Sequence, residues 1–300
     1  MIGIEDGTVT TVDTGVGSDN GLSAVYTWDS DGDSFADTAY AGDLRGNLWR
    51  FSGLGSSPSA SLLFAAMDDD DNPQPITAAP LAGKNPDTGD VWVFFGTGRY
   101  LNEADTSDTS MQTWYGLIDS GSEILGRAQL KSRAILAEGV INGFDARAIE
   151  EPAAGDMAGK RGWYIDLTGT RERMVLPNQF VGTVLVGTSR IPDSTDPCNP
   201  SGRGFVMAID PFSGGRLPDS FFDFTLDGFF TNSDKLLVDG EYLAVSGIGF
   251  SSSPNNPLFM GGGETGGVMM VGLEDGSQRK IDTRVFGAEA GRLSWREILQ

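Results

Sequence analysis

Residues 38–51 read TAYAGDLRGNLWRF, and this stretch decides the predicted fold. An apolar strand ends in a small residue and Gly42, and a second apolar strand opens at Gly46 and runs through Trp49 to Phe51. Two short apolar runs joined by a polar turn that contains glycine are typical of a β-hairpin. The stretch therefore predicts one pair of neighbouring strands in a β-sheet.

The same two-part unit recurs along the chain. Repeated strand–turn–strand units indicate a propeller or a solenoid, because one unit cannot bury both of its faces and must stack on its neighbours. Small residues near the strand ends fit the crowding where the blades of a propeller converge. Residues 91–97, 184–188 and 242–247 repeat the first part, residues 113–118, 204–210 and 267–273 repeat the second, and residues 162–167 resemble a second part without a clear partner.

We therefore expect an all-β fold, a modified β-propeller with long loop insertions, to which residues 1–300 contribute as one domain. Successive first parts are roughly 50–90 residues apart, against about 40–50 residues per blade in regular propellers, so loops must hold the excess. Four or five hairpins are too few to close a ring, so the propeller is expected to be incomplete. The polar stretches that fit such loops are residues 68–75, 104–110, 193–203 and 251–263.

Two further expectations complete the prediction of the fold. Helical periodicity is scarce, and short helices are expected only at residues 125–138 and 294–299. The alternative to a propeller is a β-sandwich with irregular loops.

An acidic loop, WDSDGDSFAD at residues 28–37, comes directly before the first hairpin. Alternate residues of a tightly curled loop point toward one centre, and carboxylates packed this closely would repel one another without a cation. Calcium takes six to eight oxygen ligands and favours charged ones. The spacing therefore predicts a calcium site in residues 29–37, with ligands from Asp29, Asp31, Asp33, the backbone carbonyl of Phe35, and Asp37.

This loop does not have the pattern of an EF-hand, which requires glycine at position 6 and glutamate at position 12. Those positions hold Ser34 and Tyr40, and a strand follows where an EF-hand has a helix. The alternative interpretation is a solvated acidic turn. That interpretation is preferred for a second acidic run, Asp68 to Asp71, because consecutive acids on an extended chain point in alternating directions.

The composition excludes several classes of function. The net charge of −21 argues against binding nucleic acid, which needs Lys and Arg to displace counterions, and against anionic membrane surfaces. The chain has no histidine, so it can form neither a Ser–His–Asp triad nor a His-ligated zinc site. Its one cysteine, Cys198, cannot form an internal disulfide. No apolar run is long enough to form a transmembrane helix.

The sequence resembles the PilC/PilY family of type IV pilus tip adhesins and biogenesis proteins. The acidic loop and the hairpin at residues 38–51 carry the strongest resemblance, and further matches follow in the expected order along nearly the whole chain. These matches are residues 74–80 (QPITAAP), 95–101 (FGTGRYL), 191–192 with 196–198, 207–215 (MAIDPFSGG) and 291–296 (GRLSWR).

The resemblance implies a C-terminal β-propeller domain with calcium in the 29–37 loop. It implies a binding module, not an enzyme, that takes part in pilus extension and retraction, twitching motility and surface attachment. Its partners would be pilin or minor pilus subunits or the outer-membrane assembly machinery, and also host or abiotic surfaces. The implied location is the periplasm, outer membrane or pilus tip. The N-terminus lacks the basic and apolar regions of a signal peptide, so the chain is expected to be a C-terminal fragment of an exported protein.

Two other functions compete with this reading. The GNLW and AIDP strands also resemble the repeats of quinoprotein dehydrogenases, which are propellers that hold a quinone with calcium. Those enzymes often carry an adjacent cysteine pair, which this chain lacks. A carbohydrate-binding propeller would stack exposed tryptophans on sugar rings, and the candidates are Trp28, Trp92, Trp114 and Trp163. Alternation within the strands favours a core position for these tryptophans instead.

Overall fold

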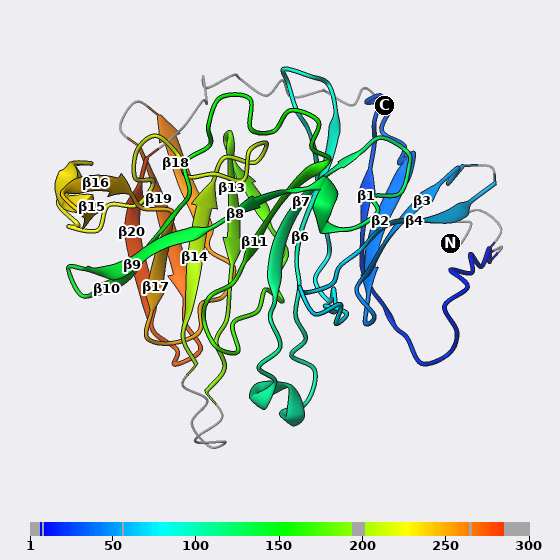
Figure 1. The fold of residues 1–300 in the computed structure, drawn as a ribbon, viewed down its shortest axis with the longest axis horizontal. Helices are drawn as coiled ribbons and strands as arrows, with labels where there is room; N and C mark the ends of the chain where they lie inside the picture. Colours follow the sequence, from blue (N-terminus) through cyan, green and yellow to red (C-terminus); the bar gives the residue numbers. More distant parts are fainter. Residues whose placement is uncertain (1–6, 8, 56, 194–201, 264–265, 285–300) are drawn as a thin grey trace, which may run out of the picture.

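The regular structure of the chain is almost entirely β-strand, and the strands pair antiparallel except for β8 with β11 (Figure 1). The computed structural model describes residues 7, 9–55, 57–193, 202–263 and 266–284. Within these residues the helical segments are short 3-10 turns, namely η1 (Glu103–Ser107), η2 (Arg127–Gln129) and η3 (Asn232–Asp234). No helix among the described residues has the length and apolar character needed to cross a membrane. The expectation of an all-β fold is confirmed.

Four sheets, which we call A to D, follow one another along the chain. Sheet A has its strands in chain order, whereas sheets B and C combine strands from distant parts of the chain. Sheet A contains β1 (Leu22–Trp28), β2 (Thr38–Asp43), β3 (Asn47–Ser52) and β4 (Ser59–Ala65). Sheet B has the order β5 (Leu81–Lys84), β6 (Val91–Gly96), β7 (Thr113–Asp119), β11 (Gly162–Asp166) and β8 (Lys131–Arg133).

The remaining strands belong mostly to the second half of the chain. Sheet C has the order β12 (Gln179–Val181), β13 (Val184–Thr188), β14 (Gly204–Ile209), β17 (Gly247–Phe250), β10 (Phe144–Ile149) and β9 (Ile135–Ile141). Sheet D contains β18 (Leu258–Gly263), β19 (Gly266–Gly272) and β20 (Gln278–Thr283). A separate hairpin, β15 (Lys235–Val238) with β16 (Glu241–Ala244), projects beside β9 (Figure 1).

Each pair of neighbouring sheets encloses an apolar core. Tyr40 and Phe64 of sheet A pack with Tyr115 of sheet B, and a second core places tryptophans of sheet B against sheet C. A third core joins Ile248 of sheet C to Ile281 of sheet D. Successive residues of a strand point to opposite faces, so a sheet between two neighbours contributes to two cores. This stacking of sheets by both faces is the packing of propeller blades.

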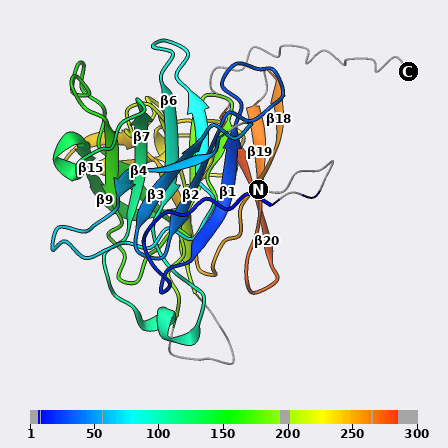
Figure 2. The same ribbon diagram turned by 90° about the vertical axis from the view of Figure 1, so that its right-hand side faces the viewer.

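The first strands of the four sheets lie next to one another. Strand β1 contacts β5, and Gly83 of β5 has no room for a Cβ because the Phe180 ring of β12 lies there. The Gln179 side chain of β12 donates to the carbonyl of Pro257, directly before β18. These strands therefore surround a common axis, as the inner strands of a propeller do. Figure 2 views the molecule from the side of sheet A, with β1 to β4 in front of the other sheets.

Most of the predicted strand units are present. The hairpins β2–β3, β6–β7 and β13–β14 have the predicted pairing, and the unpartnered unit at 162–167 is β11, which pairs antiparallel with β7. Two predictions need correction. Residues 242–247 do not form one strand but are divided between β16 and β17, and the predicted loop 251–263 contains β18.

The predicted helix at residues 125–138 is wrong. Gly126 has a φ of +95°, and the segment after it forms a 3-10 turn followed by β8 and β9. Strand β9 alternates between half-buried and exposed positions and pairs along its length with β10, so tertiary packing overrides the helical propensity of its Leu, Ala and Glu residues. The second predicted helix, at 294–299, and Cys198 lie outside the described residues.

Candidate metal centre

The acidic loop is the connection between β1 and β2. The backbone N–H of Asp37 donates to the carbonyl of Trp28 at 3.0 Å, and the two strands pair from Trp28 with Thr38 onward. The hairpin therefore fixes both ends of the loop on paired backbone, and the residues between them curl outward into solvent.

The curl of the loop is organised around Asp29. The two oxygens of its carboxylate accept the backbone N–H groups of Gly32 at 2.7 Å and Ser34 at 2.8 Å. Gly32 has a φ of +80° and Ser34 a φ of +76°, so the chain passes twice through the left-handed region. Glycine adopts that region without steric cost, and this explains the glycine at the fourth position of the loop.

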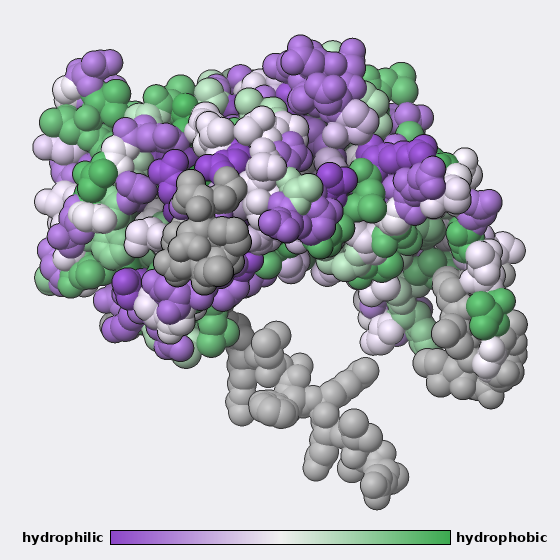
Figure 3. Space-filling view, turned by 90° about the horizontal axis from the view of Figure 1, so that it is seen from below, coloured by the Kyte–Doolittle hydropathy of each residue, from purple (hydrophilic) through white to green (hydrophobic). Residues whose placement is uncertain are grey.

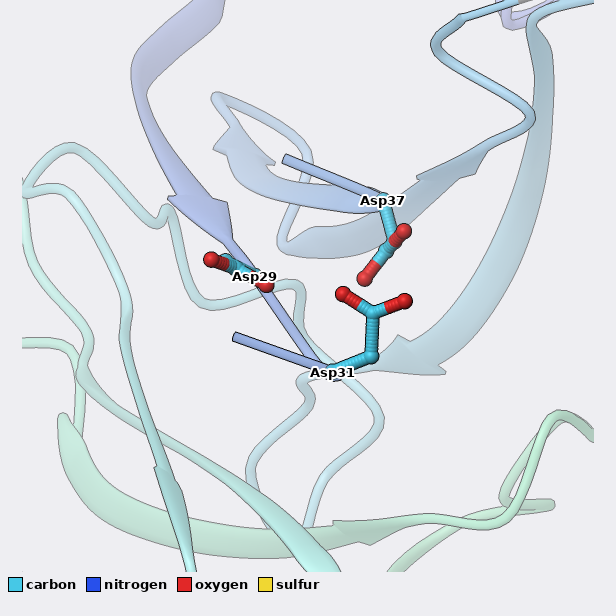
Figure 4. A group of neighbouring side chains, drawn as sticks. All are labelled: Asp29, Asp31 and Asp37. Atoms are coloured by element: carbon cyan, nitrogen blue, oxygen red, sulfur yellow. The ribbon is translucent and has the colours of Figure 1, made fainter. Parts of the chain in front are cut away.

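Three of the predicted ligands lie together. Asp29, Asp31 and Asp37 each offer one carboxylate oxygen, and these oxygens lie within 4.8 Å of one another. Figure 4 shows the carboxylates of Asp31 and Asp37 facing each other across the loop. Ser30 contributes to the arrangement, since its backbone N–H and its hydroxyl both donate to Asp37, at 2.7 and 2.5 Å.

The other two predicted ligands lie outside this group. The Asp33 carboxylate accepts the backbone N–H of Phe35 at 2.8 Å. The Phe35 side chain is 76% exposed, so its ring does not anchor the loop. Whether Asp33 and the Phe35 carbonyl join a coordination shell stays a prediction from the spacing.

The hydrogen bonds within the loop keep two of its carboxyls ionised. The pKa of Asp29 lies below its ordinary value, chiefly because the backbone N–H of Gly32 donates to the carboxylate. The pKa of Asp37 is also lowered, and here the main donor is the Ser30 hydroxyl. Both groups therefore carry their negative charge throughout the neutral range. A set of charged oxygen ligands at short range fits a hard cation such as calcium.

The second acidic run does not converge in this way. Asp68 accepts the backbone N–H groups of Asp70 and Asn72, and Asp69 pairs with Arg127 at 3.0 Å. Among the described residues, no second group of three acidic or cysteine side chains brings its ligand atoms as close together as the 29–37 loop does.

Arg127 is a central residue that the sequence did not signal. Its guanidinium pairs with Asp166 at 2.9 Å, donates to the Thr113 hydroxyl at 2.7 Å and stacks over the Tyr164 ring at 4.6 Å. Together with its bond to Asp69, these contacts attach the second acidic run to sheet B. Asp69 to Asp71 are exposed to solvent, as predicted, and the ion pair with Arg127 anchors the run at one point.

Comparisons with known proteins identify the family. A family model described as the PilY1 beta-propeller domain matches residues 4–61 and 54–146. A type IV pilus biogenesis factor PilY1 homolog of Xylella fastidiosa (strain Temecula1) is 43% identical over 289 residues, which cover 94% of this chain. The crystal structure of the Pseudomonas aeruginosa PilY1 C-terminal domain superposes on 94% of this chain with a TM-score of 0.76 and 26% identity. The chain belongs to the PilC/PilY family.

This membership confirms the predicted class of fold, a modified β-propeller. The PilY1 protein of P. aeruginosa (strain PAO1) is 29% identical over 295 residues, which cover 82% of the chain. The chain spans 22% of the Xylella relative, 25% of this Pseudomonas protein and 65% of the solved PilC/PilY domain.

Proposed function

We propose that this chain is a calcium-binding β-propeller module of a type IV pilus biogenesis and tip-adhesin protein. The relatives in the PilC/PilY family are named as type IV pilus biogenesis factors, and none of those names denotes an enzyme. The observation that carries the calcium part is the convergence of Asp29, Asp31 and Asp37 within 4.8 Å at the β1–β2 connection. The module acts by binding partners, and its calcium state regulates pilus extension and retraction, twitching motility and surface attachment.

The proposed role also implies where the module acts and what it binds. It acts outside the cytoplasm, in the periplasm, at the outer membrane or at the pilus tip, against pilin or minor pilus subunits or the assembly machinery. A bound ion would hold the three carboxylates together and make the loop rigid. A partner that binds the rigid loop more tightly than the free one would then be sensitive to calcium.

The competing functions have less support. A carbohydrate site needs tryptophans that a sugar ring can reach, but Trp92, Trp114 and Trp163 are buried in the cores. A quinoprotein site needs a base near its calcium, and each of the three clustered carboxylates is used as a metal ligand. We therefore retain neither as a second proposal.

The direct test is calorimetric titration of calcium into the chelator-treated chain. We expect one site in the unmodified chain and a loss of affinity of at least about 100-fold in Asp31→Asn, since affinity follows the number of charged ligands. Asp70→Asn is the matched control, because it removes an exposed acid from the other acidic run. The same titration of Asp33→Asn shows whether Asp33 joins the shell. Equal affinity in Asp31→Asn and the unmodified chain would refute the site.

The role in the pilus is tested separately. A strain that carries Asp31→Asn in its chromosomal copy should assemble a protein of normal abundance but show altered twitching and pilus retraction. Normal motility in that strain, combined with the loss of calcium binding in vitro, would leave the calcium site intact and remove its proposed regulatory role.

The pH dependence of calcium binding follows from the lowered pKa values of Asp29 and Asp37. A carboxyl whose pKa is depressed stays ionised until the pH falls below its ordinary value of 3.8. We therefore expect the calcium affinity to be nearly constant from about pH 7 to about pH 5 and to fall only below about pH 4. Titrations in buffers of equal ionic strength measure this profile. A tenfold loss between about pH 7 and pH 5 would contradict the assignment of these ligands.

A further inference from the structure

The hairpin of β15 and β16 is apolar on both of its faces. On one face, Leu236 is buried and packs with Val238 and Leu243 into the core that joins sheets C and D. On the other face, Leu237 and Tyr242 lie directly opposite each other in the strand register and are 61% and 51% exposed. Successive residues of a strand point to opposite faces, so the exposed pair forms an apolar surface separate from the core.

The loop that leads into β15 presents two more apolar side chains to solvent. Phe229 is 69% exposed and Leu226 is 51% exposed, and the loop enters β15 through η3. We call these two residues, together with Leu237 and Tyr242, the apolar tip. Figure 3 shows exposed hydrophobic side chains at the left-hand end of the molecule, the end at which Figure 1 places the β15–β16 hairpin.

The conformation of this loop is strained at Leu226. This residue has a φ of +58°, in the left-handed region, which a bulky side chain other than glycine rarely adopts. Such a conformation persists only where the surrounding structure enforces it, and it occurs preferentially where a chain binds or reacts. The strain therefore needs both a structural cause and a functional reason.

Two fully buried aspartates are the structural cause. Asp223 accepts the backbone N–H groups of Leu226 and Gly228, both at 2.7 Å. Asp234 accepts the N–H of Thr231 at 2.8 Å and those of the two residues before Leu226 at 2.9 and 3.0 Å. The apolar side chains of the loop are thus held in place before any partner arrives, which lowers the entropy cost of binding one.

Exposed acids accompany the apolar tip. Asp227 lies between the two apolar residues of the loop, and Asp239 and Glu241 lie at the turn of the hairpin. Two basic residues of this region, Lys235 and Arg284, pair instead with one other carboxylate, at 3.5 and 3.4 Å. An exposed apolar patch with a polar rim marks a site of protein–protein interaction, and here the rim is negative.

The charge of this rim decides which occupant fits. A second copy of the chain would bring two acidic rims together, and each copy already carries a net charge of −21. An anionic lipid surface would be repelled in the same way. A protein with Lys or Arg around an apolar pocket would instead gain complementary charges at the rim while it covers the apolar centre.

We propose that the apolar tip is a docking surface for a partner protein whose contact face is an apolar pocket bordered by lysine or arginine side chains. Leu237 and Tyr242 lie at the centre of the interface, and Asp227, Asp239 and Glu241 face the basic residues of the partner. Figure 1 places the tip and sheet A, which carries the acidic loop, at opposite ends of the molecule. The inference therefore does not depend on the calcium site.

The test is photo-crosslinking of the full-length protein in the strain that produces it. A p-benzoylphenylalanine in place of Tyr242 puts the photoreactive group at the centre of the tip, and the same replacement of Leu125, which is 74% exposed, is the positional control. We expect one protein adduct from the Tyr242 position, at a site bordered by Lys or Arg, and no such adduct from the Leu125 position.

Charge reversal provides the second arm of the test. Glu241→Lys, added to the protein with the photoreactive group at position 242, should lower the adduct yield about tenfold at equal protein abundance, because it places a positive charge against a basic rim. Asp87→Lys is the matched control, since it reverses an exposed acid in the β5–β6 turn, and it should leave the yield unchanged.

Several outcomes would overturn the proposal. These are no adduct from the Tyr242 position, an adduct only with lipid or with a second copy of the chain, an adduct site without basic neighbours, and a yield that Glu241→Lys does not lower. A charge-sensitive adduct at a basic site of a protein outside the pilus machinery would support this docking surface and would contradict the partners given under the proposed function.

Discussion

Replacing Arg147 with methionine should lower the free energy of unfolding by about 3–5 kcal/mol, because the change leaves a buried carboxylate without its counter-ion. The Arg147 guanidinium and Glu172 are 1% and 0% exposed, and they form two hydrogen bonds of 2.7 and 3.1 Å. The guanidinium also lies 3.7 Å from the centre of the Phe205 ring. The Arg147–Glu172 ion pair joins β10 in sheet C to the segment that leads from sheet B to sheet C.

Urea denaturation of a small series of variants measures this effect. The double variant Arg147→Met with Glu172→Met removes both charges, so it should recover a substantial part of the loss seen in Arg147→Met. Lys280→Met removes one partner of an exposed pair with Asp282 and should change stability by no more than about 1 kcal/mol. Equal losses of unfolding free energy in Arg147→Met and Lys280→Met would show that burial does not set the strength of the Arg147–Glu172 pair.

Replacing Trp163 with alanine should cost about 3–5 kcal/mol, the range for removing a large aromatic side chain from a core. Trp163 is fully buried between sheets B and C, and its indole N–H donates to the carbonyl of Pro211 at 2.7 Å. A Cβ at Gly116 or at Gly214 would lie 2.4 Å from the ring, so the backbone packs directly on both sides of it. Such a site has little freedom to collapse around the cavity that alanine would leave.

The same denaturation experiment distinguishes a core role from a ligand-binding role. Trp163→Phe keeps part of the aromatic packing and should be destabilised less than the alanine variant, although it loses the bond to Pro211. Leu237→Ala, at an exposed position, should be nearly neutral. A stable Trp163→Ala variant would reopen the hypothesis that this tryptophan stacks on sugar rings.

The sequence predicts those parts of the fold in which local pattern and tertiary packing agree. The hairpin of β2 and β3 is recognisable because its two apolar runs are adjacent and its turn contains Gly46, which adopts a φ of +83°. The mostly apolar run from residue 242 to 247 predicts a single strand, because sequence alone does not reveal that the chain leaves β16 and enters β17 of another sheet here. The helix predicted at residues 125–138 is wrong because helix-forming residues occupy several positions of the half-buried strand β9, so its local composition favours a helix that the packing does not allow.

In the candidate site, too, the local sequence pattern predicts some features, and tertiary packing determines the others. The spacing of the carboxylates predicts that the acids of the 29–37 loop share one side of the curl, and Asp29, Asp31 and Asp37 do lie close together. The same spacing predicts Asp33 in this group, but its carboxylate lies outside it. The sequence does not reveal that Ser30 positions Asp37 through two hydrogen bonds. It also does not reveal Arg127, whose partners come from three separate segments of the chain. Contacts of that kind depend on the finished packing of the sheets.

The strand order of sheet C has a consequence for how the chain folds during synthesis. Sheets A and B contain only residues up to Asp166, so both can form while the remainder of the chain is still being made. Strand β10, by contrast, pairs Ala146 with Ile248 of β17 and must wait about a hundred residues for this neighbour. Until then the β9–β10 hairpin exposes a strand edge that could pair with the wrong chain, so long-range pairing makes sheet C the slow and aggregation-sensitive step of folding.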